Sequence, residues 1–458
     1  MKIIIVGDGK LGYTLAELLS KDNNVVIIDK NADILQKTVE NLDVMCVHGN
    51  ATSARILLEA GVKDADLLIA VTSGDEVNMV CCFTAKRLGA QHTIARIRDP
   101  EYAAELSRLK LDLGLDLIIN PDQALAREIA KLLQFPPAAH IEMFAQGHVE
   151  MVEIKITPAM PIVGVALKDV RQTVNSSILI GAALRDQEAI IPNGEFVIQP
   201  NDRIYLIGRP SEIYDFCKQI GMKIPKITDV MVIGGGRSGY YLAKSLENSG
   251  MDVKIVEIDY DRCVYLSENL SKAMIIHGDG SDDALLQSEN LNEMQAFIAL
   301  TGRDEENLMS ALMAKQAGVS KVVAKISRTR YVRVIEEMGV DNILNPKYIA
   351  ATYISSFVRG LKNAIGNPVN MLYHILDNQA EAVEFIAGAT ARILNTPLKN
   401  LRICPGVLVA AIVRKNRIMI PHGEDTIQEN DFVIIISKNM QLMDIDDILE
   451  QEIAGQEM

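Results

Sequence analysis

Two glycine-rich segments carry the spacing of a dinucleotide-binding loop: GDGKLG, beginning at Gly7, and GGGRSG, beginning at Gly234. Each follows a run of apolar residues and precedes an amphipathic helical pattern. In such a loop the first glycine permits a tight turn, the second lets the backbone approach a pyrophosphate, and the third lets helix and strand pack closely. The helix N-terminus then offers free N–H groups and a partial positive charge to phosphates. Both segments therefore predict phosphate binding.

An acidic residue ends the second expected strand of each half. Asp29 lies 17 residues after Gly12, and Glu257 lies 18 residues after Gly239. At about 20 residues beyond such a loop, a carboxylate accepts hydrogen bonds from ribose hydroxyls. A carboxylate there also disfavours a 2′-phosphate, so NAD-type or adenine ligands are favoured over NADP. The alternative is a solvated acid at a strand end.

Matched cations and turns occur at the strand ends of both halves. Lys10 matches Arg237, and Arg96 matches Lys325. These cations would suit ligand phosphates, although each is equally compatible with an ordinary surface position. Single histidines after the third strands are interpreted as structural. The turns that would border a ligand at the carboxyl edge of each sheet are Asn50-Ala51 and Thr72-Ser73 in the first half, and Asp279-Gly280 and Thr301-Gly302 in the second.

Groups that would perform catalysis are not found in the sequence. There is no P-loop and no GxSxG nucleophile elbow. A repeated Pro-x-Gly-x4-Gln-x-Asn-Asp element, ending at Asp202 and again at Asp431, is typical of hairpin turns. None of the 6 cysteines forms a CxxC pair or has metal-ligand spacing with histidine. We therefore expect no catalytic residue and no metal site.

The elements that position these residues occur twice. VHGNATS from Val47 matches IHGDGSD from Ile276, and IPNGEFVIQPND from Ile191 matches IPHGEDTIQEND from Ile420. Corresponding segments lie about 229 residues apart, which is half of the 458-residue chain. The repeat therefore accounts for the whole sequence.

Each half begins with short β-branched strands that alternate with longer helical patterns, which predicts a doubly wound parallel sheet. A strand-rich stretch with a short terminal helix follows and predicts a small α+β domain. The predicted fold class is α/β, with two Rossmann domains that are each followed by a small α+β domain. The expected domains are residues 1–135 and 228–364 for nucleotide binding, and 138–221 and 367–453 for the small domains.

The bulk composition restricts the partners. A net charge of −14 argues against a nucleic-acid backbone or an anionic lipid surface as the main partner. No apolar run reaches the roughly 18–20 residues that span a bilayer, and the N-terminus lacks a signal-peptide core. We therefore expect a cytoplasmic protein that is not inserted into the membrane.

Several motifs together resemble an RCK unit, a regulator of K⁺ conductance: MKIIIVGDGKLG, the GDE-N element after AVTS, IARIR, NP before a helix, and the strand-rich tail. Two units in one chain resemble the TrkA-type regulatory subunits of Trk potassium-uptake systems. The resemblance implies NAD(H), with ATP or ADP as further ligands, and a homo-oligomer, either a dimer or a tetramer ring. It also implies a membrane-embedded Trk-type K⁺ uptake protein as partner, placing the chain at the inner face of the membrane.

By position, the resemblance implies ligand contacts in both halves. It makes Arg96 a phosphate contact, whereas the role of Lys325 stays open. The contacts implied in the first half are Gly7, Asp8, Gly9, Lys10, Leu11, Asp29, Asn50, Ala51, Thr72, Ser73 and Arg96. Those in the second half are Gly234, Gly235, Gly236, Arg237, Ser238, Glu257, Asp279, Gly280 and Thr301.

The predicted function is a non-enzymatic regulator that gates a potassium channel-like partner through nucleotide-dependent conformational change. Two alternatives remain. One is an NAD-dependent oxidoreductase with its substrate between the halves, and the other is an assembly scaffold with vestigial loops.

Overall fold

A computed structural model of the chain describes residues 1–110, 112–328, 340–362, 369–376, 379–438 and 441–450. Contacts between Cα atoms divide the chain into two compact units. One contains residues 1–134 and 227–355, and the other contains residues 135–226 and 356–458. Each unit therefore combines a segment of the first half with its counterpart in the second half.

The first half begins with a six-stranded parallel sheet in the order β3-β2-β1-β4-β5-β6. This is the strand order of the doubly wound dinucleotide-binding fold, in which ligands bind where the order reverses. The reversal lies between β1 and β4. Strand β1 pairs in parallel with β4 on one side and with β2 on the other. The strands are β1 (Lys2–Val6), β2 (Asn24–Asp29), β3 (Met45–His48), β4 (Leu67–Ala70), β5 (His92–Arg96) and β6 (Leu117–Ile119), and the helices are α1 (Lys10–Leu19), α2 (Ala32–Asn41), α3 (Ala54–Glu59), α4 (Asp75–Leu88), α5 (Pro100–Leu109) and α6 (Pro121–Gln134).

The second half repeats this sheet in the order β14-β13-β12-β15-β16-β17. The repeat and the α/β class predicted from the sequence are thereby confirmed. The strands are β12 (Asp229–Ile233), β13 (Asp252–Glu257), β14 (Met274–His277), β15 (Ala296–Ala299), β16 (Lys321–Lys325) and β17 (Asn342–Leu344), and the helices are α9 (Arg237–Asn248), α10 (Tyr260–Asn269), α11 (Asp283–Ser288), α12 (Asp304–Gln316) and α14 (Pro346–Lys362).

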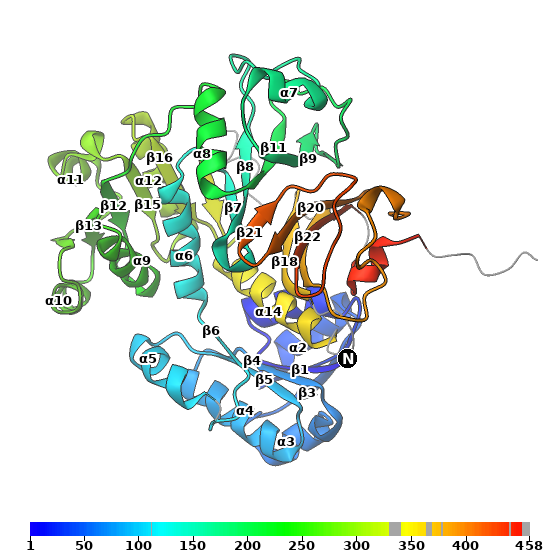
Figure 1. Ribbon diagram of the computed structural model, residues 1–458. Helices are drawn as coiled ribbons and strands as arrows, with labels where there is room; N and C mark the ends of the chain where they lie inside the picture. Colours follow the sequence, from blue (N-terminus) through cyan, green and yellow to red (C-terminus); the bar gives the residue numbers. More distant parts are fainter. Residues whose placement is uncertain (111, 329–339, 363–368, 377–378, 439–440, 451–458) are drawn as a thin grey trace, which may run out of the picture. The chain divides into compact units, whose positions relative to one another are not determined.

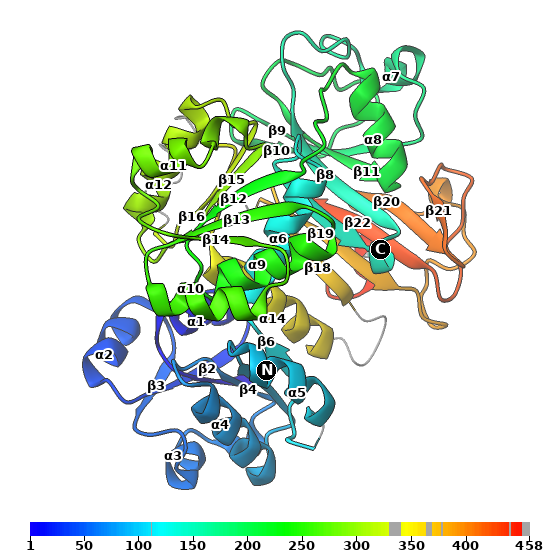
Figure 2. The same cartoon turned by 90° about the vertical axis from the view of Figure 1, so that its left-hand side faces the viewer.

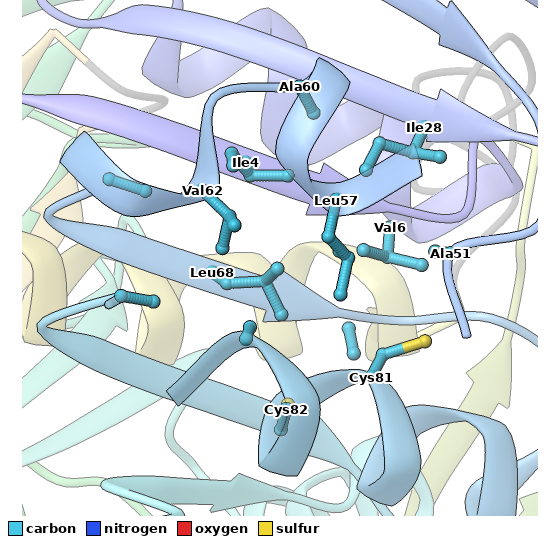
Figure 3. Close-up of a cluster of buried hydrophobic side chains, with 14 of the residues drawn as sticks. Ile4, Val6, Ile28, Ala51, Leu57, Ala60, Val62, Leu68, Cys81 and Cys82 are labelled. Carbon is cyan, nitrogen blue, oxygen red and sulfur yellow. The ribbon is translucent and has the colours of Figure 1, made fainter. Parts of the chain in front are cut away.

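Apolar side chains from both surfaces of a strand are buried, because helices cover both faces of a parallel sheet. In the first half, Ile4, Leu57 and Leu68 have no exposed surface and pack with the thiols of Cys81 and Cys82 (Figure 3). Burial raises the pKa of Cys81 to about 12. These thiols therefore serve as small apolar core groups.

Helix α6 of the first half packs against helix α9 of the second half, and both views show the two helices side by side (Figures 1 and 2). Leu125, Ile129 and Leu133 of α6 are buried in one apolar cluster with Val230 and Leu242 of the second half. The sequence predicts α6 but not this packing, because its apolar face does not reveal which sheet it covers.

Each small domain contains a five-stranded antiparallel sheet, in the orders β10-β9-β11-β8-β7 and β18-β19-β22-β20-β21. The two sheets share an apolar core in which the rings of Phe144 and Tyr373 meet edge to face, with centroids 5.1 Å apart. The elements are β7 (His140–Phe144), β8 (Val149–Lys155), α7 (Leu167–Thr173), β9 (Leu179–Arg185), β10 (Glu188–Ile190), β11 (Arg203–Gly208) and α8 (Pro210–Gln219) in the first, and β18 (Val369–Ile375), β19 (Ala380–Ile386), β20 (Val407–Arg414), β21 (Arg417–Met419) and β22 (Phe432–Lys438) in the second.

The repeated Asn-Asp element forms a turn. Asn201 has φ +69°, in the left-handed region that asparagine tolerates. The buried carboxylate of Asp202 accepts hydrogen bonds from Nε and Nη2 of Arg185 at 2.8 and 2.7 Å. Asp431 and Arg414 repeat this pair. The element therefore has a structural role, as its turn chemistry predicts.

Two further differences from the sequence interpretation concern local elements. Helices α5 and α7 and strand β7 were not predicted individually. The second half ends in a short 3-10 helix at Ile445–Ile448 where the first half has α8. The domain boundaries stay a prediction, and the boundary expected near residues 365–368 lies outside the described residues.

Candidate nucleotide-binding site

The first glycine loop joins β1 to α1 at the carboxyl edge of its sheet. Gly7 has φ +99°, and a Cβ there would lie 3.0 Å from the backbone of Thr72. A Cβ on Gly12 would lie 1.8 Å from the carbonyl oxygen of Gly7. A Cβ on Gly9, by contrast, would have no described atom within 4 Å. Gly7 and Gly12 are therefore required by the fold, whereas Gly9 leaves space beside the helix N-terminus.

Asp29 holds this loop from the end of β2. Its Oδ2 accepts a hydrogen bond from the amide of Asp8 at 2.7 Å, and its Oδ1 accepts one from the amide of Asn31 at 2.8 Å. Each carboxylate oxygen can accept a further bond, so Asp29 can position the loop and still bind ribose hydroxyls. The predicted acid thus stands beside the predicted loop.

Asp8 is placed differently from its neighbours in the loop. It is 3% exposed, and its Oδ2 accepts a hydrogen bond from the hydroxyl of Thr38 at 2.6 Å. The pKa of Asp8 is raised overall. Burial is the main cause and the charge of Asp29 adds to it, whereas the hydrogen bond from Thr38 acts in the opposite direction. Its side chain faces the protein interior, so Asp8 supports the loop and does not line the cavity described next.

A cavity of about 720 Å³ opens at the topological switch point of the first sheet. Its volume lies within the range of roughly 300–1,000 Å³ that is usual for small-molecule and cofactor sites. All the residues predicted for the first half line it except Asp8: Gly7, Gly9, Lys10, Leu11, Asp29, Asn50, Ala51, Thr72, Ser73 and Arg96.

The cavity is electropositive. Five cationic side chains line it, including those of Arg96 and Arg98, whereas only two carboxylates do. Arg96 donates one hydrogen bond from Nη2 to the carbonyl oxygen of Thr72, and its buried Nε has no partner among the described residues. Burial lowers the pKa of Arg96 to about 10, which leaves it cationic at neutral pH. A buried N–H without a partner favours binding of an anionic group.

Sequence reasoning missed some lining residues. Arg98 donates from Nη2 to the carbonyl oxygen of Ser73 at 2.8 Å; its signal was the second arginine of IARIR. Others belong to the second half, namely Ser327, Asn345, Pro346 and Lys347. The matching NP motifs were recognised, but nothing in the sequence indicates that one half contributes to the site of the other.

The second glycine loop has the same backbone geometry. Gly234 has φ +96°, a Cβ on Gly239 would lie 2.3 Å from the carbonyl oxygen of Gly234, and a Cβ on Gly236 would meet no described atom within 4 Å. Glu257 accepts hydrogen bonds from the amides of Gly235 and Asp259 at 2.7 and 2.9 Å. The predicted pairing of loop and acid therefore occurs in both halves.

The polar side chains around the second loop are bonded to other protein groups. Ser238 donates to Oδ1 of Asp122 at 2.6 Å, and Arg262 donates from Nε to the carbonyl oxygen of Gly235 at 2.7 Å. Asp279 accepts from the amide and hydroxyl of Ser281, and these hydrogen bonds lower its pKa.

Remaining predicted positions have local partners. The amide of Thr301 donates to Oδ1 of Asn307 at 2.8 Å, and Lys325 donates to the carbonyl oxygen of Leu300 at 2.8 Å. A Cβ on Gly280 would lie 2.0 Å from Ile233, so this glycine permits close packing. Arg237 begins α9, as Lys10 begins α1.

His48 and His277 are bonded to carbonyl oxygens of Lys30 and Ile258, in line with a structural role. Within the described ranges, no group of three or more His, Cys, Asp or Glu side chains could hold a metal ion. No helix in that same part of the chain is long and apolar enough to cross a bilayer.

Comparison with known proteins agrees with this architecture. The TrkA-N domain matches residues 3–121 and 230–346, and the TrkA-C domain matches residues 151–221 and 382–450. The Trk system potassium uptake protein TrkA homolog 1 of Methanosarcina mazei is 36% identical over 445 residues, covering 95% of this chain and 97% of the relative. The Vibrio alginolyticus TrkA protein is 33% identical, covering 96% of each chain.

Solved structures show the same fold at lower identity. The GsuK RCK domain is 19% identical, with a TM-score of 0.63, and covers 96% of this chain and 92% of its own. A GsuK channel bound to NAD is 20% identical, with a TM-score of 0.62, and covers 96% and 77%. With both domain types present twice and full-length relatives above 30% identity, the chain belongs to the TrkA family of Trk system potassium uptake proteins.

Proposed function

We propose that this chain is a nucleotide-binding regulatory subunit of a Trk-type potassium uptake system, and that its first-half cavity binds NAD(H) or an adenine nucleotide. The observation that carries the proposal is the cavity itself. A glycine loop with open space at Gly9, the carboxylate of Asp29 and an unpartnered N–H of Arg96 meet at the switch point of one sheet.

Each part of this cavity suits one part of the ligand. The amides at the start of α1 and the cations Lys10 and Arg96 would bind phosphates. Asp29 would accept from the ribose hydroxyls and disfavour a 2′-phosphate. Asn50 and Ala51 lie at the same edge and would border the adenine.

The proposed response to ligand follows from the fact that residues of both halves of the chain form the cavity wall. Residues of both halves line it, so a bound nucleotide would contact both. A ligand shifts a conformational equilibrium only by the difference between its affinities for the two states. A nucleotide that contacts both halves would bind two states with different affinities whenever the separation of the halves differs between those states.

The partner in this proposal is a membrane-embedded Trk-type K⁺ uptake protein. The chain would assemble as a homo-oligomeric ring on its cytoplasmic side and gate it without catalysing a reaction. The names of the full-length relatives support the potassium system, and the NAD-bound channel of the same fold supports the ligand.

The test is calorimetric titration of the purified protein with NADH and with ATP, together with K⁺ flux through the partner. The proposal expects binding, a nucleotide-dependent flux and a constant reduced-nicotinamide absorbance. Absence of any nucleotide binding would refute it. Consumption of NADH with a small metabolite would instead indicate an oxidoreductase.

A further inference from the structure

The two halves place opposite charges at equivalent positions. Each NP motif starts a long helix, and the next residue is Asp122 in α6 and Lys347 in α14. The backbone here is alike in both halves, since Asn120 and Asn345 each accept a hydrogen bond from the amide two residues on. The two halves therefore share the backbone conformation at this position and differ in the charge of the side chain.

Lys347 lines the first-half cavity, although it belongs to the second half. It is half-buried, and its ammonium lies 4.9 Å from the centroid of its neighbour Tyr348. Among the described residues its ammonium has no ion-pair partner. The first glycine loop thus has an uncommitted cation contributed by the other half.

Asp122 lines the first-half cavity as well, and it also contacts the second glycine loop. Its Oδ1 accepts a hydrogen bond of 2.6 Å from the hydroxyl of Ser238, in the first turn of α9. A helix N-terminus is where a phosphate would bind, and here a carboxylate already lies beside it. The equivalent residue of the first loop is Leu11, which has no hydroxyl to hold a carboxylate.

A second contact also distinguishes the loops. Arg262 donates to the carbonyl oxygens of Gly235 and Gly236 at 2.7 and 3.2 Å. The residue at the equivalent place in the first half is Ile34, which lines the open cavity. The second loop is therefore held by an arginine on its carbonyl oxygens and by a carboxylate at its helix terminus.

We infer that the charged residues Lys347 and Asp122 make the two loops unequal toward phosphate. Lys347 is a phosphate contact and specificity determinant of the first-half cavity. Asp122 acts as a built-in anion that keeps ligand phosphates from the second loop. This inference rests on the proposed nucleotide-binding function and adds to it which loop binds polyphosphate and which residues decide.

The test compares ADP with adenosine in calorimetric titrations of the full chain. The unmodified protein should bind one ADP per chain with measurable affinity. Lys347→Gln should weaken ADP binding roughly tenfold or more, because a hydrogen bond to a charged group is lost, and should leave adenosine binding unchanged. Lys272→Gln removes an exposed lysine elsewhere in the second half and should leave both affinities unchanged.

Asp122→Ala provides the complementary arm. It frees Ser238 and removes the carboxylate, so the stoichiometry should rise toward two ADP per chain. Thermal unfolding of each variant separates loss of folding from loss of binding.

The outcomes separate the inference from the function on which it rests. No ADP or NAD binding by the unmodified protein would refute the proposed function. Two equivalent ADP sites in the unmodified protein, or unchanged ADP affinity in a folded Lys347→Gln, would overturn the inference and leave nucleotide binding in place. Unchanged stoichiometry in a folded Asp122→Ala would overturn the part that concerns the second loop.

Discussion

Replacing Gly9 with aspartate should abolish nucleotide binding without unfolding the protein. Gly9 is the N-cap of α1, with extended backbone angles of φ −77° and ψ −172°. Aspartate is among the preferred N-cap residues, and a Cβ at Gly9 meets no described atom within 4 Å. The substitution is therefore compatible with the fold and should leave the unfolding temperature unchanged or slightly raised.

The expected loss of affinity follows from charge. A carboxylate about 4 Å from a phosphate, at an effective dielectric constant of about 20, costs about 4 kcal/mol. Since 1.4 kcal/mol corresponds to a tenfold change in affinity, NADH binding should weaken on the order of a thousandfold. Isothermal titration measures this affinity directly.

Gly9→Asn is the matched control, because asparagine has nearly the same size and is also a good N-cap residue but carries no charge. It should lose much less affinity than Gly9→Asp, and the difference between the two variants should shrink as salt is added. If a folded Gly9→Asp bound NADH as tightly as the unmodified protein, the ligand would not lie at this loop, and a scaffold with vestigial loops would be favoured.

Other predictions concern the fold and the second half of the chain. Gly12→Ala should destabilise the protein by about 3 kcal/mol or more, because its Cβ would lie 1.8 Å from the carbonyl oxygen of Gly7; chemical denaturation measures this, and a stable variant would contradict the close approach. Asp202→Ala should cost about 3 kcal/mol by leaving Arg185 unpaired, with nucleotide affinity unchanged in titration. Glu384 is fully buried and accepts hydrogen bonds from the amide of Ala145 and from Asn370, and burial raises its pKa. Its stabilising contribution is full below the ordinary glutamate pKa and is lost as the pH rises through the raised value. Glu384→Gln should therefore gain stability relative to the unmodified protein as the pH rises above the ordinary glutamate pKa. Thermal unfolding measured as a function of pH would refute this if the difference in stability between the two proteins did not change with pH.

Local patterns predicted most elements of the fold because each depends on neighbouring residues. The spacing of Gly7, Gly9 and Gly12 indicated the β1–α1 loop, and Asp29 was found from its distance along the chain. The structure brings these residues into one cavity because parallel strands end at the same edge of a sheet.

Contacts between the halves could not be predicted in this way. The apolar face of α6 indicates burial but not its partner, which is the second half. For the same reason Lys347 gave no signal as part of the first-half cavity. Arg262 was also missed, because its hydrogen bonds to Gly235 and Gly236 depend on how α10 packs beside the loop.

The central claim is that nucleotide in the first-half cavity controls potassium movement through a membrane partner. The most direct measurement is K⁺ flux into vesicles that contain the Trk-type pore, with the purified chain added and NADH or ATP titrated. We predict that flux changes with nucleotide for the unmodified chain and not for Gly9→Asp, while both bind the vesicles. Flux that is independent of nucleotide, or that responds equally with Gly9→Asp, would contradict the account.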